Sequence, residues 1–320
     1  YQSAIIEDLE IRGTGGSGAA DQNWAEAALE INASGAWIEN ALIEDNIAPG
    51  IRLFFADSTT TINNASIKNC GNPVKGAHAA GIYNTAAFFA PIMNNLTIEN
   101  SAGPGIWAEG GGAIQGNDWM LTNNSAQGMY VDGSAMVVDG MEIHHNNLSG
   151  IKVNDGRKVE LSNVSSSGNG HQSTGPEDGA GMVFIESNDL ESNSGDVMCR
   201  NCVSRGDAWG AVWAKDSVDL WLDGFEIYDP LNGTPAIAID NSGLTKSFQG
   251  GHFNILGVNV WLNRSGPAID IKDAAGVIDG LDMHGSHLGL HWDGDDSGSW
   301  VSELSHTTLR GSDCLRLSNH

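Results

Sequence analysis

Basic residues are scarce in this chain. Lys and Arg number 15 against 40 Asp and Glu, which gives a formal net charge of −25 at pH 7. Such a surface repels the phosphate backbone of nucleic acids and the headgroups of anionic membranes. Long hydrophobic runs are missing too, because no stretch of about 18 apolar residues occurs, as a membrane-spanning helix requires. The composition therefore argues against nucleic acid partners and against membrane insertion.

Cysteine is also scarce, and four residues do not make a disulfide framework. Cys199 and Cys202 have the spacing of half a zinc site, but no second pair follows them. The alternative is a local disulfide, which suits an extracellular protein. The chain also contains eight Asn-x-Ser/Thr sequons, which are compatible with a secreted glycoprotein. They begin at Asn32, Asn64, Asn95, Asn123, Asn147, Asn163, Asn232 and Asn263.

A repeated unit is what the sequence does contain. A glycine or small residue followed by alternating apolar residues recurs in steps of mostly about 22 to 25 residues, as in Gly105-Ile106-Trp107, Gly128-Met129-Tyr130 and Gly150-Ile151-Lys152. Period-two alternation over three or four residues, broken by Gly and Asn, predicts short strands. Leucine-rich repeats have a similar period, but their Leu-x-x-Leu-x-Leu frame is absent. The pattern predicts an all-β parallel β-helix, a single solenoid of about 11–12 coils with three short strands per coil.

The ends of the chain carry no recognisable caps. Residues 1–6 already have a strand pattern with no signal peptide before them, and residues 315–318 lie inside or just after a strand. Solenoids need polar caps at their ends. We therefore expect residues 1–320 to form one β-helix domain that is a fragment of a longer protein, with flanking domains as partners.

Asn residues at one turn are predicted to stack between coils. Asn46, Asn124 and Asn146 precede their marker glycine by four residues, and Asn100 precedes its glycine by five. Asn tolerates left-handed backbone conformations, and its amide can bond the turns above and below. Insertions at 71–80, 168–180, 229–234 and 256–266 are expected to leave one corner and to wall one side of the neighbouring face.

The outward positions of the glycine-led strand form the most informative surface. In coil order they are expected to be Arg52, Tyr83, Trp107, Tyr130, Lys152, Phe184, Trp213, Ala238, Asp270, His291 and Arg316. Tyr83, Trp107, Tyr130, Phe184 and Trp213 then make a ladder of rings, since coils stack about 4.8 Å apart. Beside this ladder, Glu109, Asp132 and Glu186 fall in the row two residues further on. Rings beside carboxylates suit an extended sugar chain. The alternative is that aromatic residues favour strands and stack on one another.

Three residues on this surface are candidates for catalysis. Glu109 and Asp132 are expected on adjacent coils at a separation near that of a retaining glycosidase pair. Lys152 is the only basic residue within the aromatic track, and it is the candidate base for a lyase reaction. For metals, Asp293, Asp295 and Asp296 form a weak candidate calcium site, because no downstream Glu follows at EF-hand spacing. We expect no cofactor apart from this possible calcium ion.

The repeated Asn-x-x-x-Gly-Ile-x-Val and Asp-Gly-Met-Glu-Ile units resemble the right-handed parallel β-helix superfamily of pectate lyases and polygalacturonases. The resemblance covers nearly the whole chain and implies a right-handed solenoid. The polygalacturonase motifs are echoed only by Asp295-Asp296 and Gly251-His252, in the wrong order, and the Arg-centred motif of pectate lyases is missing. We therefore expect an extracellular or cell-surface β-solenoid with a structural or adhesive role that binds or displays polysaccharide. The alternative is a polysaccharide lyase or glycoside hydrolase acting along the same face.

Overall fold

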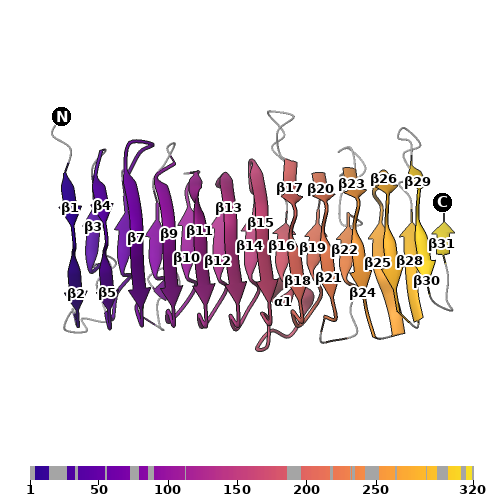
Figure 1. Ribbon diagram of the computed structural model, residues 1–320, viewed down its shortest axis with the longest axis horizontal. Helices are drawn as coiled ribbons and strands as arrows, with labels where there is room; N and C mark the ends of the chain where they lie inside the picture. The colour runs from indigo at the N-terminus through magenta and orange to yellow at the C-terminus, as the bar shows by residue number, and fades with distance from the viewer. Residues whose placement is uncertain are drawn as a thin grey trace.

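The chain folds into a β-helix whose coils stack along the long axis, with the two termini at opposite ends (Figure 1). The computed structural model describes residues 4–13, 27–32, 35–54, 56–72, 79–85, 90–111, 113–185, 196–216, 219–230, 232, 235–241, 252–263, 265–285, 287–293, 302–310 and 315–318. These residues form a 19-stranded sheet and a 12-stranded sheet, called sheet A and sheet B here, and every strand pairing is parallel.

Sheet A runs along one side of the coils. Its strands are β1 (Ile5–Glu7), β2 (Glu10–Arg12), β4 (Trp37–Glu39), β5 (Leu42–Glu44), β7 (Thr61–Lys68), β9 (Ile92–Glu99), β11 (Ile114–Thr122), β13 (Met136–His144), β15 (Val159–Ser167), β17 (Asp196–Arg200), β18 (Val203–Arg205), β20 (Asp219–Asp223), β21 (Glu226–Tyr228), β23 (His252–Leu256), β24 (Asn259–Trp261), β26 (Ala275–Asp279), β27 (Asp282–His284), β29 (Glu303–Ser305) and β30 (Thr308–Arg310).

Sheet B holds the glycine-led strands, one from each coil. Its strands are β3 (Leu29–Ile31), β6 (Ile51–Leu53), β8 (Ile82–Asn84), β10 (Ile106–Glu109), β12 (Met129–Asp132), β14 (Ile151–Asn154), β16 (Met182–Ile185), β19 (Val212–Lys215), β22 (Ile237–Asp240), β25 (Ser265–Lys272), β28 (His287–Asp293) and β31 (Leu315–Ser318). One short helix, α1 (Pro176–Gly179), precedes β16. No helix in the described ranges is long and apolar enough to cross a membrane. The predicted all-β solenoid is thus confirmed.

The sequence predicted three short strands per coil, and sheet A contains two of the three. In every coil a residue with φ between 43° and 71° marks the junction between the two halves of sheet A. These junction residues are Asp8, Asn40, Asn64, Asn95, Asp118, Gly140, Asn163, Asn201, Gly224, Gly257, Gly280 and His306. In β7, β9, β11, β13 and β15 the strand continues through its junction. The other coils have two separate strands there. Asn, Asp and Gly dominate because they tolerate the left-handed conformation.

The core is a set of inward rows that run the length of the solenoid. Ile51, Ile82, Ile106, Met129 and Ile151 are successive register partners in sheet B, and each is fully buried. Where a marker glycine precedes the strand, this packing requires it, as Gly128 shows. A Cβ on Gly128 would lie 2.6 Å from Ile143 Cγ2 and 2.7 Å from the Gly150 carbonyl oxygen. A side chain at this corner would therefore push the coils apart.

Range 256–266 was wrongly predicted to be an insertion. It contains the end of β23 and the whole of β24, which pair with β20 and β21 before them and with β26 and β27 after them. Phe253, Ile255, Val258 and Val260 are all fully buried in the core rows. This range therefore belongs to a complete coil.

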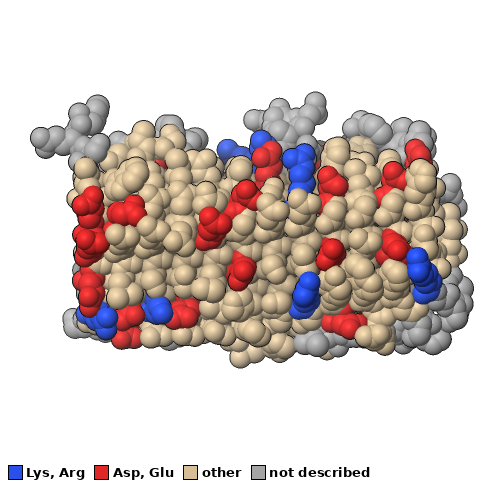
Figure 2. Space-filling model, in the orientation of Figure 1, with Lys and Arg blue, Asp and Glu red and all other residues tan. Residues whose placement is uncertain are grey.

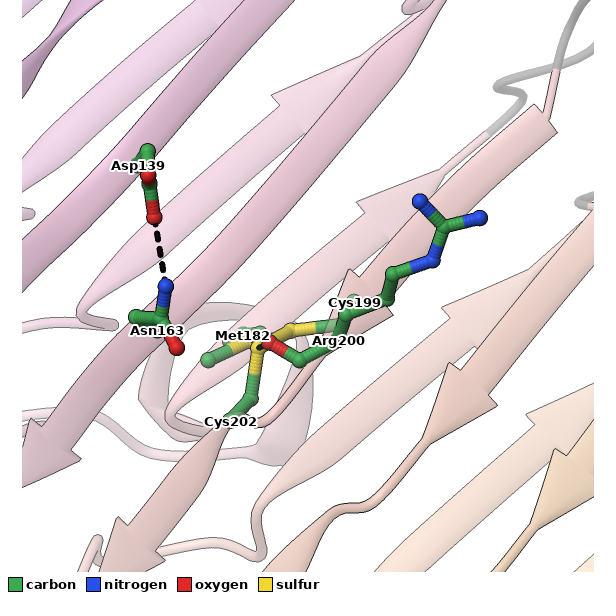
Figure 3. The surroundings of a disulfide bond; sticks show 6 residues. All are labelled: Asp139, Asn163, Met182, Cys199, Arg200 and Cys202. Atoms are coloured by element: carbon green, nitrogen blue, oxygen red, sulfur yellow. Dashed lines mark hydrogen bonds between the residues drawn. A yellow bond between two sulfur atoms is a disulfide. The ribbon is translucent and has the colours of Figure 1, made fainter.

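Cys199, in β17, forms a disulfide with Cys202 (Figure 3). The alternative of a local disulfide is thus confirmed, and the interpretation of this pair as half of a zinc site was wrong. Both residues are fully buried, and Cys199 Sγ lies 3.7 Å from Met182 Sδ across the core. The bridge closes the junction at Asn201, whose φ is 52°. Cys70 remains a free, buried thiol.

The predicted asparagine ladder exists, with different members. Asn124 donates from Nδ2 to Asn146 Oδ1 at 2.9 Å, and Asn146 donates in the same way to Asn169 Oδ1 at 2.9 Å. The position expected for Asn100 belongs to Ser101, whose backbone N–H donates to Asn124 Oδ1. Asn46 bonds instead to Glu44 O and lies near Cys70 Sγ. These ladder amides are buried, whereas Asn100 is exposed at a left-handed corner.

A buried carboxylate terminates this ladder. Asp207 is fully buried, and its Oδ1 accepts hydrogen bonds from both the backbone N–H and Nδ2 of Asn169 at 2.9 Å. Its Oδ2 accepts hydrogen bonds from Ser166 and Ser204. A carboxylate can only accept while it is ionised, so Asp207 orients every amide of the ladder in one direction. Burial raises the pKa of Asp207, although these four donors act to lower it.

Asp207→Asn should change how stability depends on pH. The raised pKa means that Asp207 favours the folded state most below about pH 3.9, its unfolded value, and that this contribution is lost as pH rises through the folded pKa. Wild type should therefore lose stability relative to Asp207→Asn as pH rises from acid to neutral. Denaturant unfolding across this range measures the difference. Asp45→Asn, which removes an exposed carboxylate, controls for net charge, and parallel wild-type and Asp207→Asn curves would contradict the prediction.

Candidate functional site

The outward row of sheet B is set by its strand register. Successive partners in this row are Arg52, Tyr83, Trp107, Tyr130, Lys152, Val183, Trp213, Ala238, Asp270, His291 and Arg316. We call the surface formed by this row and the row two residues further on the sheet B face. Four of the five expected rings lie on it, at Tyr83, Trp107, Tyr130 and Trp213.

Phe184 was wrongly placed in this row. Its register partner is the inward residue Val153, and Phe184 is fully buried. Val183 takes the outward position beside Lys152 and is itself fully buried. The neighbouring row is displaced by one residue in the same way, because Ile185, and not the expected Glu186, pairs with Asn154. Glu186 lies outside the described residues. The aromatic ladder is therefore interrupted between Tyr130 and Trp213.

Trp107 and Tyr130 form the centre of the sheet B face, and we call this pair the ring platform. Their ring centroids are 4.6 Å apart and their planes are tilted by 49°. Both side chains are half-buried. Trp107 Nε1 donates to Glu109 Oε2 at 3.0 Å, and Asn154 Nδ2 donates to the Tyr130 hydroxyl at 2.8 Å. The polar atoms of both rings are thus fixed, while the tilt prevents the rings from covering each other completely.

Tyr83 contributes less surface than the sequence indicated. Only 7% of the residue is exposed, and its hydroxyl donates to Glu109 Oε1. Burial, followed by the hydrogen bond to Glu109, raises the pKa of Tyr83. The Arg52 guanidinium lies over the Tyr83 ring at 5.9 Å and over the Phe54 ring at 5.0 Å. Tyr83 therefore supports Glu109 and the edge of the ring platform.

Glu109 and Asp132 are register partners on β10 and β12, beside the ring platform. Both oxygens of Glu109 accept hydrogen bonds, one from Tyr83 and one from Trp107. The pKa of Asp132 is raised by burial first, then by the negative charges of Glu109 and Asp155. Burial also raises the pKa of Tyr130, with Asp132 adding to the effect. The two neighbouring carboxylates therefore have different environments, which is the arrangement that separates acid from base roles in enzymes.

Lys152 and Lys215 bind the carboxylates of α1. Lys152 Nζ lies 2.7 Å from Asp178 Oδ1, and Lys215 Nζ lies 3.0 Å from Glu177 Oε1. Their strands β14 and β19 flank β16, so α1 spans three strands of sheet B. The 168–180 insertion walls the face here, as the sequence predicted. The Lys152 amine is therefore already engaged by a carboxylate of α1, which disfavours it as the base of a lyase reaction.

Trp213 lies on β19, the last of the three strands that α1 spans, in an apolar part of the face. Its neighbours in the row are Val183, which is fully buried, and Ala238, which is 5% exposed. Trp213 is half-buried, and its Nε1 is shielded from solvent without a hydrogen-bond partner among the residues that the structure describes. Further along, His291 Nδ1 lies 2.8 Å from Asp270 Oδ1, and Lys272 Nζ lies 3.4 Å from Asp270 Oδ2.

The calcium site stays a prediction. Asp293 ends β28 on the sheet B face, but Asp295 and Asp296 lie outside the described residues. Within the described ranges no group of three or more His, Cys, Asp or Glu side chains is arranged to hold a metal ion.

A second set of rings on sheet A was missed from the sequence. Tyr228 and Trp261 stack at 4.6 Å with an angle of 4°, and Trp261 and His284 stack at 5.6 Å with an angle of 9°. We call these three residues the ring stack. Arg205 covers the outer face of Tyr228 at 4.6 Å. Because these rings are nearly parallel, both faces of Tyr228 and of Trp261 are occupied by neighbouring rings or by the guanidinium.

Comparisons with known proteins agree with this geometry. Residues 82–217 match the family model described as a right handed beta helix region. The structure is similar to the A-module of the mannuronan C-5 epimerase AlgE4 from Azotobacter vinelandii, with a TM-score of 0.53 and 12% identity, over 99% of this chain and 88% of that one. An endo-xylogalacturonan hydrolase from Aspergillus tubingensis is more distant, with a TM-score of 0.30 and 10% identity over 90% and 85% of the two chains. No curated protein matches the sequence.

The predicted resemblance is therefore confirmed at the level of the fold. The chain folds as a parallel β-helix, and residues 82–217 match the right handed beta helix model. At 12% identity, the likeness to the epimerase module shows the fold alone.

Proposed function

We propose that this protein binds an extended polysaccharide along the sheet B face, as an extracellular or cell-surface β-solenoid with a structural or adhesive role. One observation carries the proposal: the tilted, half-buried ring platform with fixed polar groups around it. In the ring stack on sheet A, the ring faces of Tyr228 and Trp261 are covered, whereas the tilted rings of the platform leave part of their aromatic surface available. Such surface on an acidic, soluble protein is typical of a contact site.

The chemistry around the platform suits a sugar chain. The ring faces of Trp107 and Tyr130 can contact the apolar faces of pyranose rings, as aromatic residues do in other interfaces. Asp132 and Asn154 lie in the next row, where carboxylate and amide groups can bond sugar hydroxyls. The wall formed by α1 limits the face at β14, β16 and β19. A ligand on the platform would thus lie along the coils that precede this wall.

Two further facts support this class of ligand and location. The similar epimerase module is named for a polysaccharide, mannuronan, which makes a sugar polymer the first class to test for this chain. The Cys199–Cys202 disulfide supports an oxidising, extracellular location. Acidic side chains also lie along the length of the side of the molecule seen in Figure 2, which favours solubility.

The second candidate is a glycoside hydrolase or lyase that uses the same face, and the unlike carboxylates favour the hydrolase. In a retaining pair, one carboxyl group has a raised pKa and acts as acid while the other acts as nucleophile. Asp132 has the raised pKa, but both Glu109 oxygens already accept hydrogen bonds from side chains of the same face. This occupation disfavours nucleophilic attack by Glu109, and we place binding ahead of hydrolysis.

One experiment separates the two candidates. Incubation with a panel of neutral and uronate polysaccharides should give retention on at least one polymer without new reducing ends or unsaturated ends. Sustained turnover that is abolished by Asp132→Asn, and kept by Asp45→Asn on an exposed corner of another coil, would instead establish the enzyme. Failure to retain any polymer would contradict both candidates.

A further inference from the structure

Two adjacent histidines at the edge of sheet A point the same way. His144 ends β13, and His145 follows it. Successive side chains of a strand normally point to opposite faces. His145 has a φ of 57°, and this left-handed conformation turns its side chain toward His144. The two Nδ1 atoms lie 3.2 Å apart, the ring planes are at 90°, and Thr122 Oγ1 lies 3.0 Å from His144 Nδ1.

Histidine is unusual at this corner. Among the described non-glycine residues with positive φ, all are Asn or Asp except His145 and His306. The preceding coil places Asn123 here with a φ of 54°, and the following coil places Gly168 with a φ of 61°. A left-handed conformation is strained for a residue with a bulky side chain and is often kept at functional sites. The repeat alone therefore does not account for His145.

The distance between the two nitrogens fits a shared ligand. In tetrahedral zinc sites each Zn–N bond is about 2.0–2.1 Å, which places two ligating nitrogens about 3.3 Å apart. We propose that His144 and His145 bind one divalent transition-metal ion through their Nδ1 atoms, a new metal site independent of the sheet B face. Imidazole pairs suit Zn²⁺, Ni²⁺ and Cu²⁺. The site has two imidazole ligands, and water takes the remaining positions beside the Thr122 hydroxyl.

A third imidazole lies close to the pair. His171 approaches from the next coil. A Cβ placed on Gly168 would lie 3.3 Å from His145 Nε2 and 3.8 Å from His171 Nε2. In the metal-free protein the two Nδ1 atoms lie within hydrogen-bond distance of each other, and for both to bind a metal each neutral ring would carry its proton on Nε2.

The preceding coil supplies a matched variant. His144 is the register partner of Thr122, so His144→Thr combined with His145→Asn copies the Thr122-Asn123 corner. Calorimetric titration with Zn²⁺ and with Ni²⁺ at neutral pH should show one-to-one binding by wild type. The double variant should bind at least tenfold more weakly and should keep the wild-type circular dichroism spectrum. His306→Asn, which alters the other left-handed histidine, should bind like wild type.

Acid provides a second readout. Protons compete with a metal ion for imidazole nitrogens, so wild-type binding at about pH 5 should be at least tenfold weaker than at neutral pH. Equal affinity in wild type and the double variant would overturn the proposal, because the metal would then be held by carboxylates elsewhere. Wild type that binds neither metal more tightly than the double variant at any pH would overturn it as well.

Discussion

Ile106→Asp should lower the free energy of unfolding by more than about 4 kcal/mol, because it places an unpaired charge in the core. Ile106 is fully buried, and its partners Ile82 and Met129 in the inward row of sheet B are fully buried too. Nothing charged lies in this row to pair with the carboxylate. Denaturant unfolding, followed by far-UV circular dichroism, measures the loss.

Ile106→Val is the matched control, and it should cost about 0.5–1.5 kcal/mol. It keeps the apolar character and removes one methylene group from the same place. An Asp variant as stable as the Val variant would show that position 106 meets solvent, and the inward row would then be wrong.

Loss of the ring platform should weaken polysaccharide binding by at least about tenfold. Each aromatic contact is worth about 1 kcal/mol, and 1.4 kcal/mol is a factor of ten in affinity. The variant combines Trp107→Ala and Tyr130→Ala, whose side chains are half-buried on the sheet B face. Because neither ring belongs to the core rows, the loss of stability should be limited to about 0.5–1.5 kcal/mol for the contact between the two rings. Calorimetric titration with the polymer retained in the panel measures the affinity.

The ring stack offers a control of the same composition. Tyr228→Ala with Trp261→Ala also removes one tyrosine and one tryptophan, but from sheet A. This variant should lose about 1–2 kcal/mol of stability, since stacked pairs contribute about 0.5–1.5 kcal/mol each, and it should keep wild-type affinity for the polymer. Equal loss of affinity in both double variants would show that the platform has no special role.

The repeat made most of the fold predictable from the sequence. A marker glycine fixes the phase of each coil, and the residue after it faces inward wherever strand alternation is clear, as at Ile106, Met129 and Ile151. The failure at Phe184 has a physical cause. Residues 182–185 are Met-Val-Phe-Ile, a continuous apolar run without period-two alternation, so the pattern does not identify the inward residues. Counting from Gly181 would have placed Met182 inward, as the structure does.

The ring stack was missed for a related reason. Trp261 lies in the coil that follows residues 242–251, and its junction residue, Gly257, resembles the loop glycines around it. Because residues 256–266 were assigned to an insertion, no ring was expected between Tyr228 and His284, and the sequence did not indicate a stack. Contacts such as Lys152 with Asp178 depend on how an insertion folds back over the sheet. No local pattern in the sequence encodes them.

The left-handed junctions within sheet A also account for three of the Asn-x-Ser/Thr sequons. Asn64, Asn95 and Asn163 occupy the left-handed junction, the next residue is buried, and the residue after that is an outward Ser or Thr of the strand. The side chains bond between coils. Asn95 donates to Asn64, and Asn163 donates to Asp139. The repeat therefore produces the Asn-x-Ser/Thr pattern at these three places. The proposed extracellular location rests on the disulfide, and the flanking domains of a longer chain stay a prediction.

Fluorine NMR on protein labelled with 5-fluorotryptophan tests the central claim most directly, because each indole reports its own surroundings. Trp107 lies on the ring platform, Trp261 lies in the ring stack, and Trp119 is 2% exposed in the core. Single Trp→Phe variants assign the three signals. Addition of the polysaccharide that the protein retains in the panel should shift the Trp107 signal and leave the signals of Trp261 and Trp119 in place. A shift of Trp261 with an unchanged Trp107 signal would contradict binding on the sheet B face.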